Sequence, residues 1–187
     1  LYGEIFPSTN CQVAVIKRTD SNLYLGTNYT IPSNVTYGGV SYEVIEIGAE
    51  SFSGCTSLQY ITLPNTIRCI NKRAFYGCSG LKGHINIPTS VRKIDDYAYF
   101  GCDSIEMLTI PHNVNSIGKQ AFRNCSRLST LRYNARNASY PTAYAETPFY
   151  NSIGLTTVQI LDSARVIPAY FLIGCQMLNT VQIGSHV

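Results

Sequence analysis

The fold of this chain is decided by residues 47–64, which read IGAESFSGCTSLQYITLP. Three similar stretches follow directly, each with a leading isoleucine, an aromatic ring five residues later and a cysteine eight residues after the isoleucine. The leading residues are Ile47, Ile70, Ile94 and Ile117, separated by 23, 24 and 23 residues. The chain is therefore built from an internal repeat.

The same eight-residue interval separates Ile167 from Cys175, which lies 50 residues after Cys125. We therefore predict a degenerate fifth unit, with its strand near residues 155–160, and a sixth that ends near Ile183. A period of this length is typical of leucine-rich repeats. The second unit carries an extra residue, because Leu81 and Ile85 are four apart rather than three, and Gly83 is suited to form a bulge there.

Stacked units share a continuous core, because one unit cannot bury its apolar face alone. We predict an α/β repeat fold: a right-handed curved leucine-rich-repeat solenoid with a parallel β-ladder on the concave side. Short helical turns or irregular coil are expected on the convex side, around the Ala-Phe-x-x-Cys segments. Strand alternation points Ile61 and Leu63 inward and Tyr60 and Thr62 outward.

Residues 1–46 do not fit the repeat and are predicted to form an N-terminal β cap over the open end of the solenoid. Gly38-Gly39, between two alternating runs, predicts a two-residue hairpin. Residues 47–187 then form the array of about six units, with an insertion at 134–154. That insertion either joins a binding surface or is a degenerate coil whose aromatic rings pack locally.

The pattern Ile-x-x-x-Ala-Phe-x-x-Cys-x-x-Leu-x-x-Leu-x-Ile-Pro resembles the BspA-type leucine-rich repeats. Residues 74–81, 120–128 and 167–175 match it, and residues 29–42 resemble the entry hairpin before such arrays. The resemblance implies a secreted or cell-surface protein, with some relatives acting as adhesins for host matrix proteins such as fibronectin or fibrinogen. It carries no catalytic residues. The chain begins Leu1-Tyr2-Gly3-Glu4, without a visible signal peptide or initiator Met, so we expect a processed chain or a piece of a longer one.

The composition favours contacts with proteins or glycans. Charged residues are 13% of the chain, about half the usual share, while tyrosine occurs 14 times. A tyrosine offers a stiff apolar ring and one polar tip. The net charge of +3 is too small to predict nucleic-acid binding, and no apolar run is long enough to span a membrane. We expect a monomer.

Cysteine spacing predicts buried thiols rather than a metal site. Five cysteines share one repeat position, and stacked coils hold such side chains about 4.8 Å apart, too far for a disulfide. These positions are Cys55, Cys78, Cys102, Cys125 and Cys175. A bridge between Cys11 and Cys69 stays open.

No catalytic, metal or cofactor site is predicted. His84 and His112 fall in different columns of the repeat, and no phosphate loop, dinucleotide fingerprint or nucleophile elbow is present. Several cations fall on one edge, which is either a basic strip for sulfated glycans or acidic partners, or a solvated edge offset by Glu50, Asp95 and Asp96. These cations are Arg68, Lys72, Arg73, Arg92, Lys93 and Arg165.

The outward strand positions form the candidate partner-binding surface, which is polar and nearly uncharged and offers hydrogen bonds at a small desolvation cost. Ten residues are assigned to it: Tyr60, Thr62, His84, Asn86, Met107, Thr109, Thr130, Arg132, Thr157 and Gln159. We predict a non-catalytic, adhesin-like module that binds a protein or glycan through this surface. The alternative is a structural spacer within a larger cell-surface protein.

Overall fold

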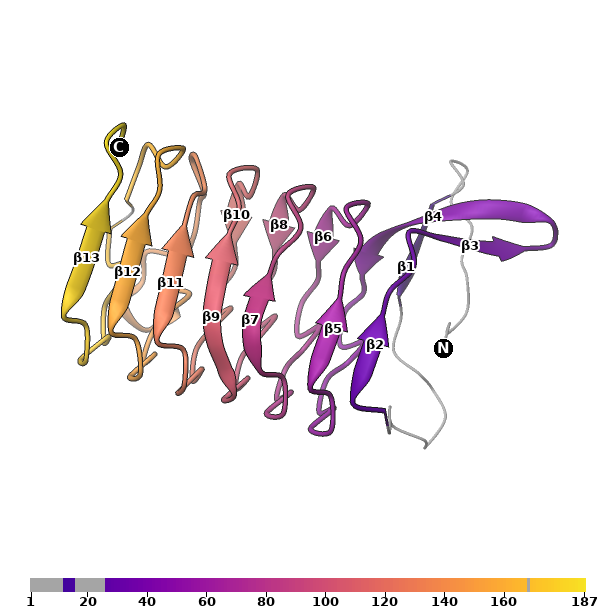
Figure 1. Cartoon of the computed structure of the whole chain (residues 1–187), viewed down its shortest axis with the longest axis horizontal. Helices are drawn as coiled ribbons and strands as arrows, with labels where there is room; N and C mark the ends of the chain where they lie inside the picture. Colours follow the sequence, from indigo (N-terminus) through magenta and orange to yellow (C-terminus); the bar gives the residue numbers. More distant parts are fainter. Residues whose placement is uncertain (1–11, 16–25, 168) are drawn as a thin grey trace.

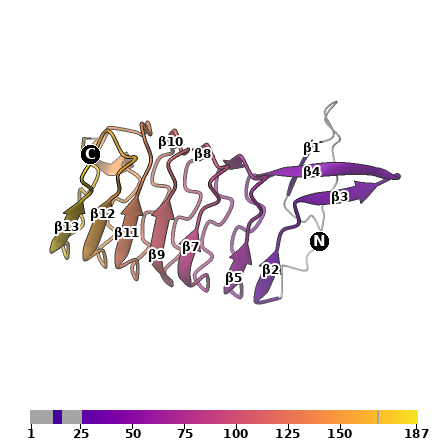
Figure 2. The same ribbon diagram turned by 45° about the horizontal axis from the view of Figure 1, so that its top comes forward.

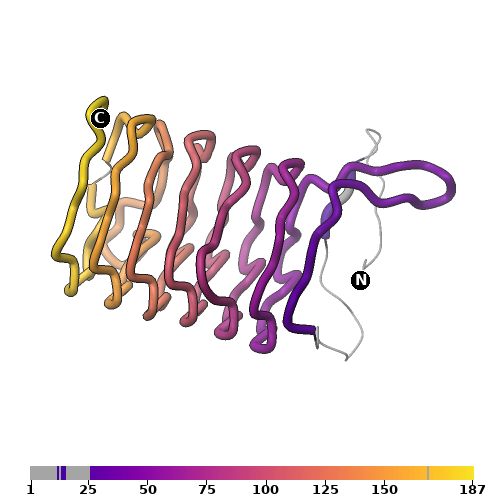
Figure 3. The backbone as a smooth tube through the Cα atoms, viewed as in Figure 1, coloured from indigo at the N-terminus to yellow at the C-terminus, as the bar shows by residue number. Residues whose placement is uncertain are grey.

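The computed structural model describes residues 12–15, 26–167 and 169–187, and it is a parallel β-solenoid of stacked coils (Figures 1 and 3). Strands and turns make up almost all of the described chain. Its only helix there is a single 3-10 turn, η1, at Tyr144–Glu146. The predicted leucine-rich-repeat solenoid is confirmed.

The main sheet, which we call the ladder, has five strands in the order β13-β12-β11-β9-β7, each contributed by one coil (Figure 1). They are β7 (Gly83–Asn86), β9 (Ile105–Ile110), β11 (Thr130–Tyr133), β12 (Thr157–Ile160) and β13 (Thr180–Ile183). All pairs are parallel, and Leu108, Leu131, Val158 and Val181 lie in one register. The first three of these side chains are buried. The strands therefore form where the sequence alternates.

A second sheet, which the sequence did not predict, runs along the leading isoleucines (Figure 2). Its parallel core is β1 (Gln12–Val15), β4 (Val40–Ile47), β6 (Cys69–Ile70), β8 (Lys93–Ile94) and β10 (Ser116–Ile117). Ile47, Ile70, Ile94 and Ile117 are all fully buried in it. The first four coils thus contribute two strands each, and the leading isoleucines form one row.

The hairpin predicted at Gly38-Gly39 is confirmed. Strand β3 (Asn34–Tyr37) pairs antiparallel with β4, and both glycines have positive φ, as a tight two-residue hairpin turn requires. Just before it, β2 (Asn28–Thr30) pairs parallel with β5 (Tyr60–Thr62) and so extends the stack by one strand. Residues 1–11 and 16–25 lie outside the described part, so the boundary of the cap at residue 46 stays a prediction.

A column of stacked aromatic rings fills the core between the two sheets. Successive rings of Phe52, Phe75, Tyr99, Phe122 and Phe149 lie 4.9 to 5.3 Å apart, with planes within 17° of each other. All five are buried. One ring from each of five successive coils therefore joins the stack, which ends at Phe149, where Phe171 of the last coil packs edge-on at 84°.

The segments that carry the first four of these rings are turns, because the backbone is left-handed on both sides of each ring. In the first unit, Glu50 has φ +56° and Gly54 has φ +76°. The corresponding residues of the second unit, Arg73 and Gly77, have φ +54° and +68°. Only three residues remain between two such positions, so an α-helix cannot extend through the segment. Of the two predicted forms, the structure has the short turn.

The five repeat cysteines are buried, as predicted, and most of their thiols lie close to the carbonyls of the ring residues. Thiols of Cys78, Cys102 and Cys125 donate hydrogen bonds to the carbonyl oxygens of Phe52, Phe75 and Tyr99 of the preceding coil, over 3.0 to 3.3 Å. These three and Cys175 are free thiols, and Cys55 is buried at the same position. Cys69 is also a free thiol, while Cys11 lies outside the described residues.

Much of the predicted 134–154 insertion follows the repeat. Ser139 bridges to Ser116, which sets Tyr140 beside Ile117, 23 residues earlier. Phe149 continues the ring column, and Ser152 donates a hydrogen bond to the carbonyl of Phe122, as the cysteines do in other coils. Between Tyr140 and Phe149 the coil is four residues longer than between Ile117 and Phe122, and η1 lies in this longer stretch. These contacts favour the degenerate coil.

Candidate functional site

The ladder arranges eight of the ten predicted binding residues in two columns. In the first, His84 pairs with Met107, Met107 with Thr130, and Thr130 with Thr157. In the second column, the successive partners are Asn86, Thr109, Arg132 and Gln159. Thr180 and Gln182 of β13 extend the two columns.

The side chains of these columns reach solvent on the outer surface of the ladder. Polar contacts among them run between neighbouring strands: His84 Nε2 lies 2.9 Å from Thr109 Oγ1, and Gln159 donates to Gln182 over 2.8 Å. Arg132 is exposed and forms no ion pair with the described residues. The columns therefore offer mostly uncharged hydrogen-bonding groups and a single guanidinium.

The remaining two predicted residues, Tyr60 and Thr62, lie on the far side of a break in the ladder. Their strand β5 pairs with β2 instead of β7, although β7 belongs to the next coil. The extra residue of the second unit accounts for the break. Gly83 takes φ +75°, and the β7–β9 register shifts between Gly83 and His84, as predicted for a bulge. The amide of Lys82 still bonds to the carbonyl of Gln59 over 3.1 Å, so the two coils separate beyond that point.

A groove of about 310 Å³ occupies this break, and we call it the seam groove. Its walls come from both strands, and it is lined by Tyr60, Ile61, Thr62, Leu63, Lys82, His84, Ile85 and Asn86. Four of the predicted binding residues, Tyr60, Thr62, His84 and Asn86, therefore meet here.

The floor of the seam groove is apolar, because the break uncovers part of the core. Ile61 and Leu63 point inward, yet both are only half-buried. Leu108 and Ile110, which hold the same positions two coils later, are fully buried. The seam is thus a place inside the stack where inward-pointing ladder side chains reach solvent.

Tyr60 and Lys82 form the polar rim of the seam groove. The tyrosine ring is 51% exposed, and the Lys82 ammonium lies 5.4 Å from its centroid, within the range of a cation–π contact. Within the described ranges, no carboxylate lies at ion-pair distance from Lys82. The rim therefore combines an aromatic face with a positive charge that no acidic side chain balances.

The second sheet presents a different, largely neutralised edge. Arg68 pairs with Glu43 at 3.3 Å, Arg73 with Glu50 at 3.7 Å, and Lys93 with Asp95 at 2.9 Å. Acidic side chains thus offset half of the predicted basic strip, and the geometry favours the solvated edge.

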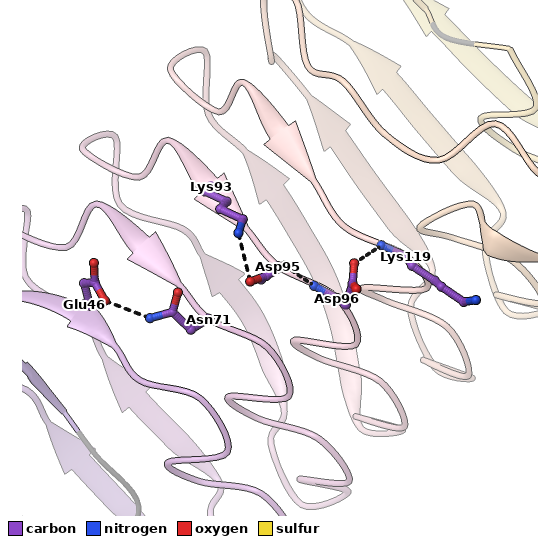
Figure 4. Close-up of polar contacts among 6 residues, drawn as sticks. All are labelled: Glu46, Asn71, Lys93, Asp95, Asp96 and Lys119. Carbon is purple, nitrogen blue, oxygen red and sulfur yellow. Dashed lines mark hydrogen bonds and ion pairs between the residues drawn. The ribbon is translucent and has the colours of Figure 1, made fainter.

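Polar contacts also link successive coils along this edge (Figure 4). Asn71 donates to Glu46 over 2.9 Å, and the amide of Lys119 donates to Asp96 over 2.8 Å. The Lys119 ammonium in turn pairs with Glu146. These groups are engaged with one another, so this edge is a weaker candidate for binding than the ladder.

The buried thiols are poor candidates for chemistry. Burial raises the pKa of Cys78 and of Cys125 to about 12, so both remain protonated near neutral pH. Across residues 12–15, 26–167 and 169–187, no three histidine, cysteine or acidic side chains are grouped to hold a metal ion. In the same ranges, no helix has the length and apolar character needed to cross a membrane.

The sequence predicted four of the eight lining residues of the seam groove as binding residues, but it did not predict the groove. The signal was present in the four-residue spacing from Leu81 to Ile85, which was predicted to be absorbed by a bulge. The bulge forms, and it also prevents β5 from pairing with β7.

Comparison with known proteins agrees with this architecture. A family model described as a BspA type leucine-rich repeat region matches six copies, over residues 26–143 and 142–187. No match was found among curated protein sequences.

Several solved structures share the fold. A T. pallidum leucine-rich repeat protein is 21% identical with a TM-score of 0.73, over 97% of this chain and 82% of that one. A leucine-rich repeat protein from Bacteroides ovatus is 20% identical with a TM-score of 0.51, over 98% and 76%. The pneumococcal vaccine antigen PcpA is 22% identical with a TM-score of 0.57, and the match covers 93% of this chain but 41% of PcpA.

At these identities the likeness to solved structures shows the fold alone, whereas the repeat model covers most of the sequence. Leucine-rich repeat solenoids are typically non-catalytic and serve binding or scaffolding. The chain belongs to the BspA-type leucine-rich repeat family.

Proposed function

We propose that this protein is a non-catalytic binding module that engages a protein or glycan through the outer surface of its ladder. The observation that carries the proposal is the unbroken register of two outward columns across five strands, which gives a regular polar surface. Among its ten side chains only Arg132 carries a full charge at neutral pH. Such a surface exchanges water for a partner at a low desolvation cost.

The contrast between the two sides of the solenoid supports the choice of the ladder. On the second sheet, ion pairs engage Arg68, Arg73 and Lys93. The ladder has an exposed arginine, Arg132, and the neighbouring strand β5 across the seam has an exposed tyrosine, Tyr60; such residues are enriched at the centres of protein interfaces. We further propose a secreted or cell-surface location and an adhesin-like role, in keeping with the family.

The test is binding of the purified chain to fibronectin, fibrinogen and a glycan array by biolayer interferometry. Arg132→Ala is the ladder variant and Tyr60→Ala the variant across the seam, and Arg92→Ala is the matched control, since Arg92 lies before β8 on the other edge. For any ligand bound by the parent chain, we expect a ladder variant to weaken binding about fivefold or more and the control to leave it unchanged. Equal binding by all variants would exclude this surface, and absence of any ligand would favour the structural spacer.

A further inference from the structure

The seam groove has two strand edges with which no strand of the described residues pairs. Strand β5 uses one edge to pair with β2, and β7 uses one edge to pair with β9. Their other edges face each other across the break, because the two strands belong to adjacent coils and line the same groove. Exposed backbone N–H and C=O groups of this kind are a template for another extended chain.

We propose that the seam groove binds a short extended peptide segment that carries an acidic side chain. The backbone of the peptide hydrogen-bonds to the open edge of β5 or β7. This inference rests on the proposed function, because it names the partner class and locates the contact on the same surface.

The dimensions of the groove fit a short segment. A volume of about 310 Å³ is near the lower limit of ligand sites, which hold from about 300 Å³ upward. The apolar floor of Ile61, Leu63 and Ile85 suits one or two aliphatic or aromatic side chains of such a segment.

The charge of the rim selects an acidic side chain. Lys82 lies beside the groove without a carboxylate partner among the described residues, and its ammonium is held over the Tyr60 ring. His84 and Asn86, on the opposite wall, supply hydrogen-bonding groups. A glutamate or aspartate in the bound segment would form an ion pair with Lys82. The rest of the wall is uncharged, so binding would displace few ordered waters from it.

The open edges decide between a peptide and an acidic sugar. A sugar could pair its carboxylate with Lys82, but it has no regular alternation of donors and acceptors to match a strand. An extended peptide has that alternation at the strand repeat of about 3.3 Å per residue. The peptide therefore satisfies both the charge and the backbone of the site.

The experiment is an NMR titration of the full chain with three blocked pentapeptides that have flanking valines and a central glutamate, glutamine or lysine. We expect the glutamate peptide to shift the amides of β5 and β7, the glutamine peptide to bind roughly two- to fivefold more weakly, and the lysine peptide more weakly still. Free glucuronate is the fourth ligand. If it shifts the same amides while the peptides do not, or if no ligand shifts them, the peptide assignment is overturned.

Two variants sharpen the test. Deletion of Gly83 restores the spacing of the other units, so we expect the ladder to close and the peptide shifts to disappear. Lys82→Glu should reverse the preference from the glutamate to the lysine peptide, which keeps the test decisive if the deletion variant does not fold. Unchanged titrations in Lys82→Glu would overturn the proposal. A negative peptide titration would not affect the binding comparison of Arg132→Ala. Failure of the seam-groove proposal can therefore be distinguished from failure of the proposed ladder function.

Discussion

The ring of Phe149 stacks on that of Phe122 at 5.2 Å, with the two planes only 5° apart. The coil between them is longer than the others, yet the column of rings continues without a break. Core packing therefore sets the repeat, and the loop length adapts to it.

Removing a ring from the middle of this column should be costly. We expect Phe122→Ala to lower the free energy of unfolding by about 3–5 kcal/mol, because Phe122 is fully buried between Tyr99 and Phe149. Urea denaturation followed by circular dichroism measures the change. The matched control is Tyr76→Ala, whose half-buried ring stacks on Phe100 outside the column, and it should cost less than half as much. Equal losses of unfolding free energy in the two variants would show that a ring in the column contributes no more to stability than a ring outside it.

Tyr99 stands where other coils have phenylalanine, and its buried hydroxyl has no hydrogen-bond partner among the described residues. Tyr99→Phe should therefore raise the free energy of unfolding by about 1 kcal/mol, since it removes an unsatisfied polar group and keeps the stacked ring. The reciprocal change, Phe75→Tyr, should destabilise the chain. Thermal unfolding of the two variants checks both signs, and a lower melting temperature for Tyr99→Phe would contradict the reading.

Stability should fall at alkaline pH because the buried thiols titrate late. The pKa of Cys78 and Cys125 is about 12 in the folded chain, against an ordinary value of 9.0. Below pH 9 both states hold the proton and these thiols give no pH dependence. Between pH 9 and 12 the unfolded chain loses the proton first, so each thiol lowers the free energy of unfolding by about 1.4 kcal/mol per pH unit. Urea melts at pH 8, 9 and 10 measure the slope, and Cys125→Ala should reduce it.

Alkylation should separate the thiols by exposure. At pH 8, iodoacetamide should modify the half-buried Cys69 well before Cys102, which is fully buried and whose pKa burial raises. Peptide mapping by mass spectrometry follows each site. In urea above the unfolding transition the two should react alike. Early labelling of Cys102 in the native chain would mean that the coils open locally.

The solenoid and the outward columns could be predicted from the sequence because each depends on a short-range pattern repeated many times. Ile61 and Leu63, for example, alternate with Tyr60 and Thr62, so one strand suffices to assign their sides. The second strand in each of the first four coils was not predicted, because pairs such as Lys93–Ile94 are too short to show alternation.

The seam groove escaped prediction for a related reason. One additional residue can either bulge outward or disturb pairing with a neighbour, and only tertiary contacts decide which. Here Gly83 has both effects: it forms a bulge relative to β9, and it leaves β7 unable to pair with β5. The left-handed backbone beside the rings was likewise not predicted, because Glu50 and Arg73 are not residues that usually adopt positive φ.

The break at the seam has a mechanical consequence. Between the first and second units the ladder contributes little backbone hydrogen bonding, while the rings of Phe52 and Phe75 and the β4–β6 pairing still join them. At this level the two units are thus joined by the second sheet and by the ring-bearing turns, where the amides of Phe52 and Gly54 donate to the carbonyls of Ala74 and Tyr76, with little contribution from the ladder. Amide hydrogens of β5 and β7 should exchange with solvent sooner than those of β11, and any bending of the array should concentrate at this joint.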